Sequence, residues 1–214
     1  MQNEKVVEES LFDARADGWD TPQRMALATG VTEAIFRTID INNTMQVLEF
    51  GSGTGLITLA LAGRAGRVLA VDSSRAMIEV LKRKIREGSF NNIETHLGGI
   101  DPDDARQGNR DLIVSSMTLH HVENTQALFA NLHRLLRAGG RIALADLERE
   151  EGDFHEDNTG VEHFGFDTDA LVRWTQEAGF REVAFSRVHV VRKVREGGKE
   201  KEYPVFLLTA VKGP

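Results

Sequence analysis

Residues 47–56 read Val-Leu-Glu-Phe-Gly-Ser-Gly-Thr-Gly-Leu, and residues 68–72 read Val-Leu-Ala-Val-Asp. The first stretch is an apolar strand that runs into a glycine-rich turn, and the turn opens a helix at Leu56. Glycine permits positive φ angles and close approach of a ligand, and the free N–H groups at a helix start favour an anionic ligand group. Asp72 ends the second strand, where a carboxylate accepts hydrogen bonds from ribose hydroxyls. The two stretches together predict a nucleotide-type ligand.

The spacing of the glycines argues against a dinucleotide. The dinucleotide fingerprint is G-x-G-x-x-G, but here the third glycine is Gly55 and position 56 is leucine, so the tight turn is displaced. Glu49 lies two residues before the first glycine. A carboxylate repels phosphates and attracts an ammonium group. We therefore expect a ligand with an ammonium group, although Glu49 has an equally good interpretation as a strand-end acid bonded to nearby backbone.

This pattern resembles motif I of the class I S-adenosylmethionine (SAM) methyltransferases. The resemblance implies that Asp72 binds the ribose, that Glu49 meets the methionine ammonium and that Met77 lies near the adenine. Both Asp72, as a helix cap, and Met77, as a packed residue, also have purely structural interpretations. The cofactor-binding residues that we expect are Glu49, Gly51, Ser52, Gly53, Gly55, Asp72, Ser73, Met77, Ile100, Asp101, Ser115 and Trp19.

Further stretches extend the resemblance from about Phe12 to Val211, toward the broad group that includes the ubiquinone and menaquinone biosynthesis methyltransferases. Each is loose alone, but their order is specific. They are the cover-like Phe12-Asp13 and Trp19-Asp20, residues 111–116 with 119–122, residues 135–141 before a fifth strand, and residues 164–167 with 171 and 178–180. The resemblance implies a SAM-dependent enzyme with SAM as its cofactor.

One position departs from the family pattern. Members commonly carry an acid after the third strand that binds the adenine amino group, and Gly99 stands there in this chain. Either Asp101 or the backbone around Ile100 is expected to replace that acid.

Strands and helices alternate along the chain and end in two β-rich runs. This order predicts an α/β, Rossmann-like, seven-stranded sheet, mostly parallel with the last strand antiparallel, and helices on both faces. A helix is expected from Asn124 to Arg137, stopping at Gly139-Gly140, and Arg141 to Asp146 is expected to be the fifth strand. The charged residues from Arg187 to Glu202 are interpreted as a solvated β-hairpin.

With 214 residues, 41% of them hydrophobic, the chain is expected to form one domain. The expected parts of this methyltransferase domain are an N-terminal helical cover (1–44), a SAM-binding core (45–146), an acceptor-side loop (147–166), and a C-terminal helix with a β-hairpin (167–214).

Composition narrows the functional classes. The net charge of −7 argues against a broad surface for nucleic-acid phosphates. The absence of cysteine excludes disulfides, thiolate zinc sites and cysteine nucleophiles. No signal peptide and no apolar run of membrane-spanning length is present, so we expect a cytoplasmic protein without membrane association. The sequence makes no prediction of the oligomeric state.

Three other functions involve a similar ligand or a similar fold. A short-chain reductase needs Tyr-x-x-x-Lys, but the single tyrosine, Tyr203, has Leu207 in the lysine position. Nucleic-acid amino methylation commonly uses Asn- or Asp-Pro-Pro-aromatic after the fourth strand, where residues 115–118 read Ser-Ser-Met-Thr, and C5 methylation needs a cysteine. A SAM-binding protein without catalysis remains open. We expect a small-molecule acceptor and no nucleic-acid partner.

The chain after the fifth strand is the expected acceptor side. Ligands of such sheets bind beyond the carboxyl ends of the strands, and Asp146 ends this one. Residues 147–166 are long for a connection, lack periodicity, and contain the pairs Phe154-His155 and His163-Phe164. We expect His155 or His163 to orient the acceptor or take its proton. The alternative is a flexible acidic loop with surface histidines.

The adjacent histidines His120 and His121 follow the fourth strand. Either one caps or packs while the other is solvated, or at least one lines the pocket and completes its polar wall with Asp146. A metal site is not expected, because H-x-x-x-H and H-E-x-x-H pairings are absent. The catalytic candidates are His155, His163, Asp146 and His121.

Overall fold

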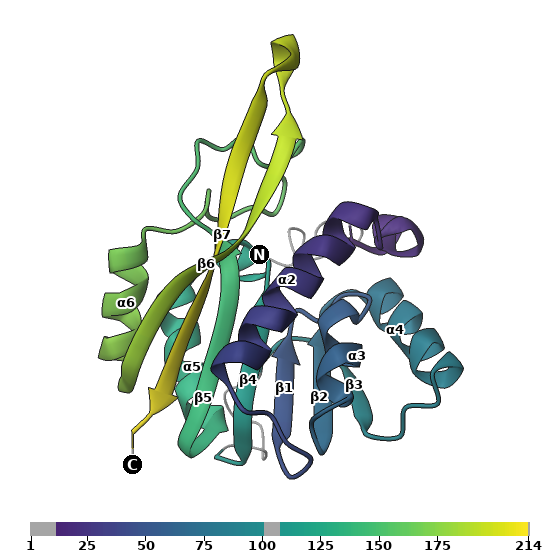
Figure 1. Ribbon diagram of the computed structural model, residues 1–214, viewed down its shortest axis with the longest axis vertical. Helices are drawn as coiled ribbons and strands as arrows, with labels where there is room; N and C mark the ends of the chain where they lie inside the picture. Colours follow the sequence, from purple (N-terminus) through teal and green to yellow (C-terminus); the bar gives the residue numbers. More distant parts are fainter. Residues whose placement is uncertain (1–11, 101–107, 214) are drawn as a thin grey trace.

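The computed structural model describes residues 12–100 and 108–213, so the expected cofactor residue Asp101 lies outside the described residues. They form one seven-stranded sheet with helices on both faces (Figure 1). The predicted α/β class is confirmed. Within these ranges no helix has the length and apolarity needed to cross a membrane.

The sheet is mostly parallel. Its strands lie in the order β3-β2-β1-β4-β5-β7-β6, and β7 runs antiparallel to β5 and β6 while the other neighbours pair in parallel. The predicted antiparallel last strand is confirmed. The strands are β1 (Gln46–Phe50), β2 (Arg67–Asp72), β3 (Ile93–Leu97), β4 (Arg110–Ser116), β5 (Leu136–Leu147), β6 (Phe180–Val194) and β7 (Glu200–Lys212).

Helices bury the two faces of the sheet. On one face lie α2 (Pro22–Thr38) and α3 (Leu56–Ala62), and on the other lie α5 (Thr125–Leu135) and α6 (Thr168–Glu177). The helix α4 (Arg75–Glu87) packs beside β2 and β3 at the edge of the sheet (Figure 1). The residues at the start of α2 favour a helix, because the Thr21 side chain caps it and Pro22 occupies its first turn.

The start of β5 differs from the expectation. The sequence predicts a helix to Arg137 and a strand from Arg141, but α5 ends at Leu135 and β5 begins at Leu136. Leu136 already pairs with Arg110 on β4, and the register shifts before the next pairing, so the intervening residues bulge. Gly139 has a φ of 72° in this bulge. The glycine pair therefore turns the chain after strand pairing has begun.

The strands β6 and β7 extend beyond the rest of the sheet as a two-stranded arm (Figure 1). Residues 189–194 pair with residues 200–205, and the 3₁₀ turn η3 (Glu196–Gly198) forms the tip. The predicted hairpin is therefore present. We call the paired residues 189–205 the arm.

The interpretation of this hairpin as simply solvated is wrong in part. The ammonium group of Lys201 lies 2.8 Å from a Glu151 oxygen and 2.9 Å from both Asp153 oxygens. Lys193 donates to the Phe154 carbonyl, and its Nζ lies 3.8 Å from the Phe154 ring centroid. The arm is thus bound to the connection between β5 and α6, which a fully hydrated hairpin would not contact.

Candidate functional site

The turn after β1 contains three left-handed glycines. Gly51, Gly53 and Gly55 have φ angles of 71°, 51° and 86°. A Cβ on Gly51 would lie 2.1 Å from Thr118 Oγ1, and one on Gly55 would lie 2.3 Å from an α4 side chain, so packing within the chain requires both glycines. Among the described atoms, a Cβ on Gly53 would meet only Trp19 Nε1, at 3.8 Å. Gly53 is therefore the position where a ligand can approach the backbone closely.

Asp72 lies at the end of β2 and is bonded to this turn. Its Oδ2 accepts from the Gly53 N–H at 2.6 Å, and its Oδ1 accepts from the Ser74 N–H at 2.9 Å. Burial raises the pKa of Asp72, those two donors oppose the rise, and Asp13 adds to it. An ionised carboxylate has about four acceptor sites, so two protein donors leave room for ligand hydroxyls. The carboxylate both fixes the turn and can receive a ribose.

The start of α4 separates two neighbouring serines. Ser74 caps the helix by accepting from the Met77 N–H at 3.2 Å, whereas Ser73 is exposed. The Met77 side chain is buried with Ala16 and Val80, between α4 and the N-terminal segment. Met77 is thus a packed residue in the first turn of α4, shortly after Asp72 and the helix cap Ser74.

Glu49 and Ser52 are buried polar groups beside the same turn. The Glu49 carboxyl is 2% exposed and accepts from the Thr58 hydroxyl. Burial raises the pKa of Glu49 to about 8; the Thr58 bond opposes the rise and Asp72 adds to it. Ser52 Oγ is buried and has no hydrogen-bond partner within the described residues. A ligand with an ammonium group for Glu49 and a polar atom for Ser52 would satisfy both.

The residue pair Trp19 and Asp20 fastens the N-terminal segment to the glycine turn. The Asp20 carboxylate accepts from the Thr54 hydroxyl and from the Lys84 ammonium, each at 2.5 Å. The guanidinium of Arg24 stacks over the Trp19 ring, 3.8 Å from its centroid, and donates to the Trp19 carbonyl at 3.1 Å. The N-terminal segment therefore lies against the glycine turn, and contacts at both Trp19 and Asp20 hold it there.

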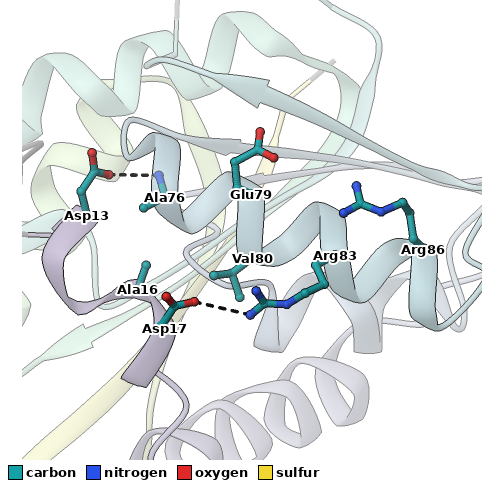
Figure 2. Close-up of a pocket in the computed structure, with 8 residues that line it drawn as sticks. All are labelled: Asp13, Ala16, Asp17, Ala76, Glu79, Val80, Arg83 and Arg86. Carbon is teal, nitrogen blue, oxygen red and sulfur yellow. Dashed lines mark hydrogen bonds and ion pairs between the residues drawn. The ribbon is translucent and has the colours of Figure 1, made fainter.

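A second acid fastens the same segment to α4. Asp13 accepts from the Ser74 hydroxyl at 2.5 Å and from the Ala76 N–H at 3.0 Å. Figure 2 shows Asp13 and Asp17 facing α4 across a groove of about 330 Å³, with Asp17 paired to Arg83 at 3.6 Å. Both acids thus join the 3₁₀ turn η1 (Ala16–Gly18) and its neighbours to the helix that begins after β2.

Two other expected cofactor residues, Ile100 and Ser115, lie after β3 and near the end of β4. Ile100 is partly buried against the core. Ser115 is fully buried on β4, and its hydroxyl donates to the Phe50 carbonyl at 2.8 Å. That bond uses the Ser115 donor to hold the ends of β4 and β1 together.

A histidine cluster, defined as His120, His121, His155 and Asp146, lies beyond the ends of β4 and β5. The ring centroid of His120 is 4.2 Å from that of His121 and 5.0 Å from that of His155. His120 Nδ1 is 2.7 Å from Asp146 Oδ1, and the two residues are 1% and 0% exposed. His120 and His121 belong to the 3₁₀ turn η2 (Leu119–His121), whereas His155 comes from the connection after β5. The structure therefore brings Asp146, His121 and His155 together, as expected from the sequence.

Burial and mutual repulsion keep two of these imidazoles neutral. Burial, then His120, lowers the pKa of His121 to about 4, against the opposing bond to the Gly160 carbonyl, whose oxygen lies 2.6 Å from Nδ1. Burial, then His120 and His121, lowers the pKa of His155 to about 3. Burial alone would raise the pKa of Asp146, but His120 and backbone N–H groups outweigh it and lower that pKa. The cluster near neutral pH thus contains one buried carboxylate and uncharged His121 and His155.

His163 is not brought into this cluster. Its Nε2 lies 2.9 Å from the Val122 carbonyl oxygen and 3.1 Å from Thr125 Oγ1, and its ring packs on Phe166 with centroids 5.1 Å apart. Its backbone N–H donates to the His120 carbonyl at 3.1 Å. Within the described ranges, no set of three or more His, Asp or Glu side chains has the arrangement of a metal site.

Comparison with known proteins shows which family this chain resembles. Residues 47–140, which include the glycine turn, Asp72 and the two adjacent histidines, match the family model of a methyltransferase domain. Residues 47–140 are therefore similar to a methyltransferase domain. The sheet order of the chain and its antiparallel last strand are those of the class I fold, and the cofactor of this class is SAM.

Two relatives in sequence are methyltransferases, and one of them acts on ribosomal RNA. An uncharacterised methyltransferase of Schizosaccharomyces pombe is 30% identical over 56% of this chain and 48% of its own length. A mitochondrial small-subunit ribosomal RNA methyltransferase of Arabidopsis thaliana is 33% identical over 41% of this chain and 22% of its own length. This chain thus spans less than half of the length of each of these relatives.

A solved structure shares the fold. Phosphoethanolamine N-methyltransferase 2 of Haemonchus contortus, in complex with SAM, matches with a TM-score of 0.69 at 14% identity, over 86% of this chain and 52% of that one.

The residues of this chain fit SAM. Gly53 leaves the backbone approachable, Asp72 retains acceptor sites for ribose hydroxyls, and Glu49 with the orphaned Ser52 hydroxyl suits an amino-acid group. Trp19 lies against the same turn. The fit rests on the buried polar atoms and the left-handed turn, and it matches the cofactor of the class.

Sequence reasoning missed the partner of Asp146. Two adjacent histidines after a strand gave no means of telling which one turns inward, because the short η2 turn sets the direction of each ring. It also did not predict the aromatic residues that pack around the histidine cluster. Phe12 packs edge-on against His121, and Phe154 packs against Tyr203 of the arm. The lone tyrosine within a charged run was the available signal for that contact.

Proposed function

We propose that this chain transfers the methyl group of SAM to a small-molecule acceptor. The observation that carries the proposal is that the glycine turn and the histidine cluster share one edge of the sheet. Phe50 at the end of β1 pairs with Ser115 on β4, and Gly51 packs against Thr118, two residues before His120. A cofactor held at the first site would therefore adjoin an acceptor held at the second.

The proposed cofactor residues divide the ligand among them. SAM, when bound, supplies a methyl group that its sulfonium already activates. We assign the ribose to Asp72, the ammonium to Glu49 and the carboxylate end to Ser52 with the N–H groups of the turn. Trp19 and the residues joined to it exclude water from this side. Ile100 and Asp101 remain assigned to the adenine side.

Aromatic and imidazole side chains of the protein surround the proposed acceptor position. Phe12 packs edge-on against His121 at 5.3 Å, and Phe154 packs edge-on against His155 at 4.8 Å. Alignment of two bound reactants can lower a barrier by roughly 7–11 kcal/mol at best, so a rigid enclosure serves methyl transfer directly. We assign acceptor contacts to His121 and His155, with Asp146 behind them, and we assign His163 to holding the connection against η2.

A small molecule suits the site better than a nucleic acid. The net charge of −7 offers little attraction for a phosphate backbone, and residues 115–118 lack the base-methylation motif. The ribosomal RNA methyltransferase among the relatives keeps RNA as the alternative acceptor to be tested.

The decisive experiment supplies methyl-labelled SAM to the purified chain with either a metabolite extract or total RNA. We expect label in a small molecule that mass spectrometry identifies, and none in RNA at physiological salt. Calorimetry should detect binding of SAM and of S-adenosylhomocysteine but not of NADH. Label in RNA would overturn the acceptor class, and SAM binding without any transfer would indicate a non-catalytic SAM-binding protein.

A further inference from the structure

His120 and Asp146 form a pair in which the position of one proton is determined. Asp146 Oδ1 accepts from the Leu147 N–H at 2.7 Å, and Asp146 Oδ2 accepts from the His120 N–H at 3.3 Å. Backbone N–H groups only donate, so both carboxylate oxygens act as acceptors here. Against the effect of burial, His120 and these donors lower the pKa of Asp146, so its carboxyl is ionised near neutral pH and only accepts, and His120 Nδ1, 2.7 Å from Oδ1, donates the hydrogen of that bond. In the neutral ring the other nitrogen, Nε2, is then a bare lone pair.

That lone pair is buried and has no protein donor. His120 Nε2 has no hydrogen-bond partner within the described residues, and neither has the buried Nε2 of His155, on a ring 5.0 Å away between centroids. Leaving a buried polar atom without a partner is unfavourable, so a water or a ligand is expected to bind such an atom. In its neutral form, His120 needs a hydrogen-bond donor at Nε2.

The surrounding charges select among acceptor groups. A carboxylate has no proton to donate and would face the His120 lone pair. An ammonium would add a positive charge in a place where burial already keeps His121 and His155 uncharged, and where Lys193 of the arm disfavours a further positive charge at His155. Asp146, the buried anion that faces His120 within residues 12–100 and 108–213, is already bonded to it. A neutral hydroxyl donates its proton and introduces no charge.

We propose that His120, oriented by Asp146, is the catalytic base for a hydroxyl acceptor, so that the product is a methyl ether. This inference rests on the proposed function and names its acceptor class. The oxygen–carbon bond forms as the sulfonium–carbon bond breaks, and the hydroxyl proton passes to His120 Nε2. The sulfonium loses its positive charge as a thioether, and the imidazolium that forms is stabilised by Asp146 before it releases the proton to water.

The first test is independent of turnover. Imidazole ¹⁵N NMR on the intact chain with S-adenosylhomocysteine bound should show His120 protonated at Nδ1 and bare at Nε2. In Asp146→Asn the side-chain amide can donate to Nδ1, and the proton should move to Nε2. A wild-type His120 protonated at Nε2 would overturn the proposal whatever the activity.

The second test uses the labelled product from the metabolite extract and the acceptor identified in it. His120→Gln should lower kcat by about 100- to 10,000-fold while SAM affinity by calorimetry stays within about twofold, because general-base catalysis contributes that range. The residual activity should rise about tenfold per pH unit, since the hydroxyl must then ionise without a base. His133→Gln, a histidine packed on Phe180 away from the cluster, is the matched control and should keep wild-type kcat.

Two results would overturn the inference alone. One is a labelled methyl ester, methylamine or thioether as product, which leaves methyl transfer in place but excludes a hydroxyl acceptor. The other is an unchanged kcat in His120→Gln on a confirmed hydroxyl acceptor. A chain that binds SAM and methylates nothing would instead remove the proposed function, and this inference with it.

Discussion

The two halves of the proposed site, one for the cofactor and one for the acceptor, are built in opposite ways. The cofactor half, at the ends of β1 and β2, comes from residues 49–77, and its decisive bonds are to backbone N–H groups, as in Asp72 with Gly53 and Ser74. The acceptor half, at the ends of β4 and β5, joins side chains from η2, β5 and the connection after β5, and the arm braces that connection. Backbone-built sites follow from local sequence, whereas side-chain sites depend on tertiary packing. The first half is therefore readable as a motif and the second is not.

Breaking the backbone of the cofactor half should produce the largest effect. Gly51→Ala places a Cβ 2.1 Å from Thr118 Oγ1 at a φ of 71°. Left-handed strain of about 1–2 kcal/mol and overpacking of about 1–3 kcal/mol together predict a loss of about 2–5 kcal/mol in the free energy of unfolding. Urea unfolding measures this loss. Gly197→Ala at the arm tip has a φ of 80° with nothing within 4 Å, so it should show the strain alone. Equal losses in the two variants would contradict the close approach of the two turns.

Removing one side chain from the cofactor half should affect binding next most strongly. Charge-assisted hydrogen bonds contribute about 1.5–3 kcal/mol each, so Asp72→Ala should weaken SAM at least tenfold, as measured by calorimetry. Asp72→Asn keeps an acceptor for one hydroxyl and should lose less. Circular dichroism must show both variants folded. Unchanged affinity in Asp72→Ala would remove this residue from the cofactor site.

The pH dependence of SAM binding should distinguish the halves further. The pKa of Glu49 is raised to about 8, so its carboxyl is mostly neutral at pH 7 without ligand. If the ligand ammonium requires the ionised form, apparent SAM affinity should rise by up to about tenfold per unit toward pH 8 and then level. The stability of the unliganded chain should fall as pH rises between about 4.5 and 8, because the folded state holds this proton more tightly than the unfolded state.

Calorimetry at several pH values and pH-dependent unfolding provide the two measurements. Glu49→Gln should remove both dependences, and a SAM affinity independent of pH in the wild type would show that Glu49 does not meet the ammonium.

The arm should affect the acceptor half alone, and only slightly. Lys201→Gln removes the contacts to Glu151 and Asp153. Exposed ion pairs contribute about 0–1 kcal/mol, so we expect at most about a fivefold rise in KM for the acceptor, with SAM affinity unchanged. Lys82→Gln, which breaks the exposed pair with Glu79 on α4, is the matched control and should leave acceptor KM unaltered. A shift in SAM affinity in Lys201→Gln would mean that the two halves are coupled through the arm.

The sequence predicted the fold closely because strands and helices carry their own periodicity and caps. The antiparallel last strand and the cap before Pro22 follow from local chemistry. The start of β5 did not, since Leu136 joins the sheet through its pairing with Arg110 before the glycine turn, and pairing partners distant in sequence leave no local signal.

The acceptor half shows the same limit. Asp146, His121 and His155 were expected near one another from strand ends and loop length, and the structure brings them together. The inward turn of His120 was not foreseen, and His163 was expected beside the acceptor but bonds to Val122. These outcomes depend on the direction of single rings, which packing decides rather than residue type.

The bracing of the connection by the arm also bears on how such a protein diversifies. The connection holds His155 and is gripped by Lys193 and Lys201, yet none of these residues contacts the glycine turn among the interactions of the described chain. We therefore expect that the arm and the connection can be replaced together, as one unit, without loss of the contacts between them. Replacing both with those of a homologue should change the acceptor preference and leave cofactor binding unchanged. Replacing the connection alone should remove its contacts with Lys193 and Lys201. Substitutions in the arm are thus expected to alter acceptor preference without changes to the core of the sheet.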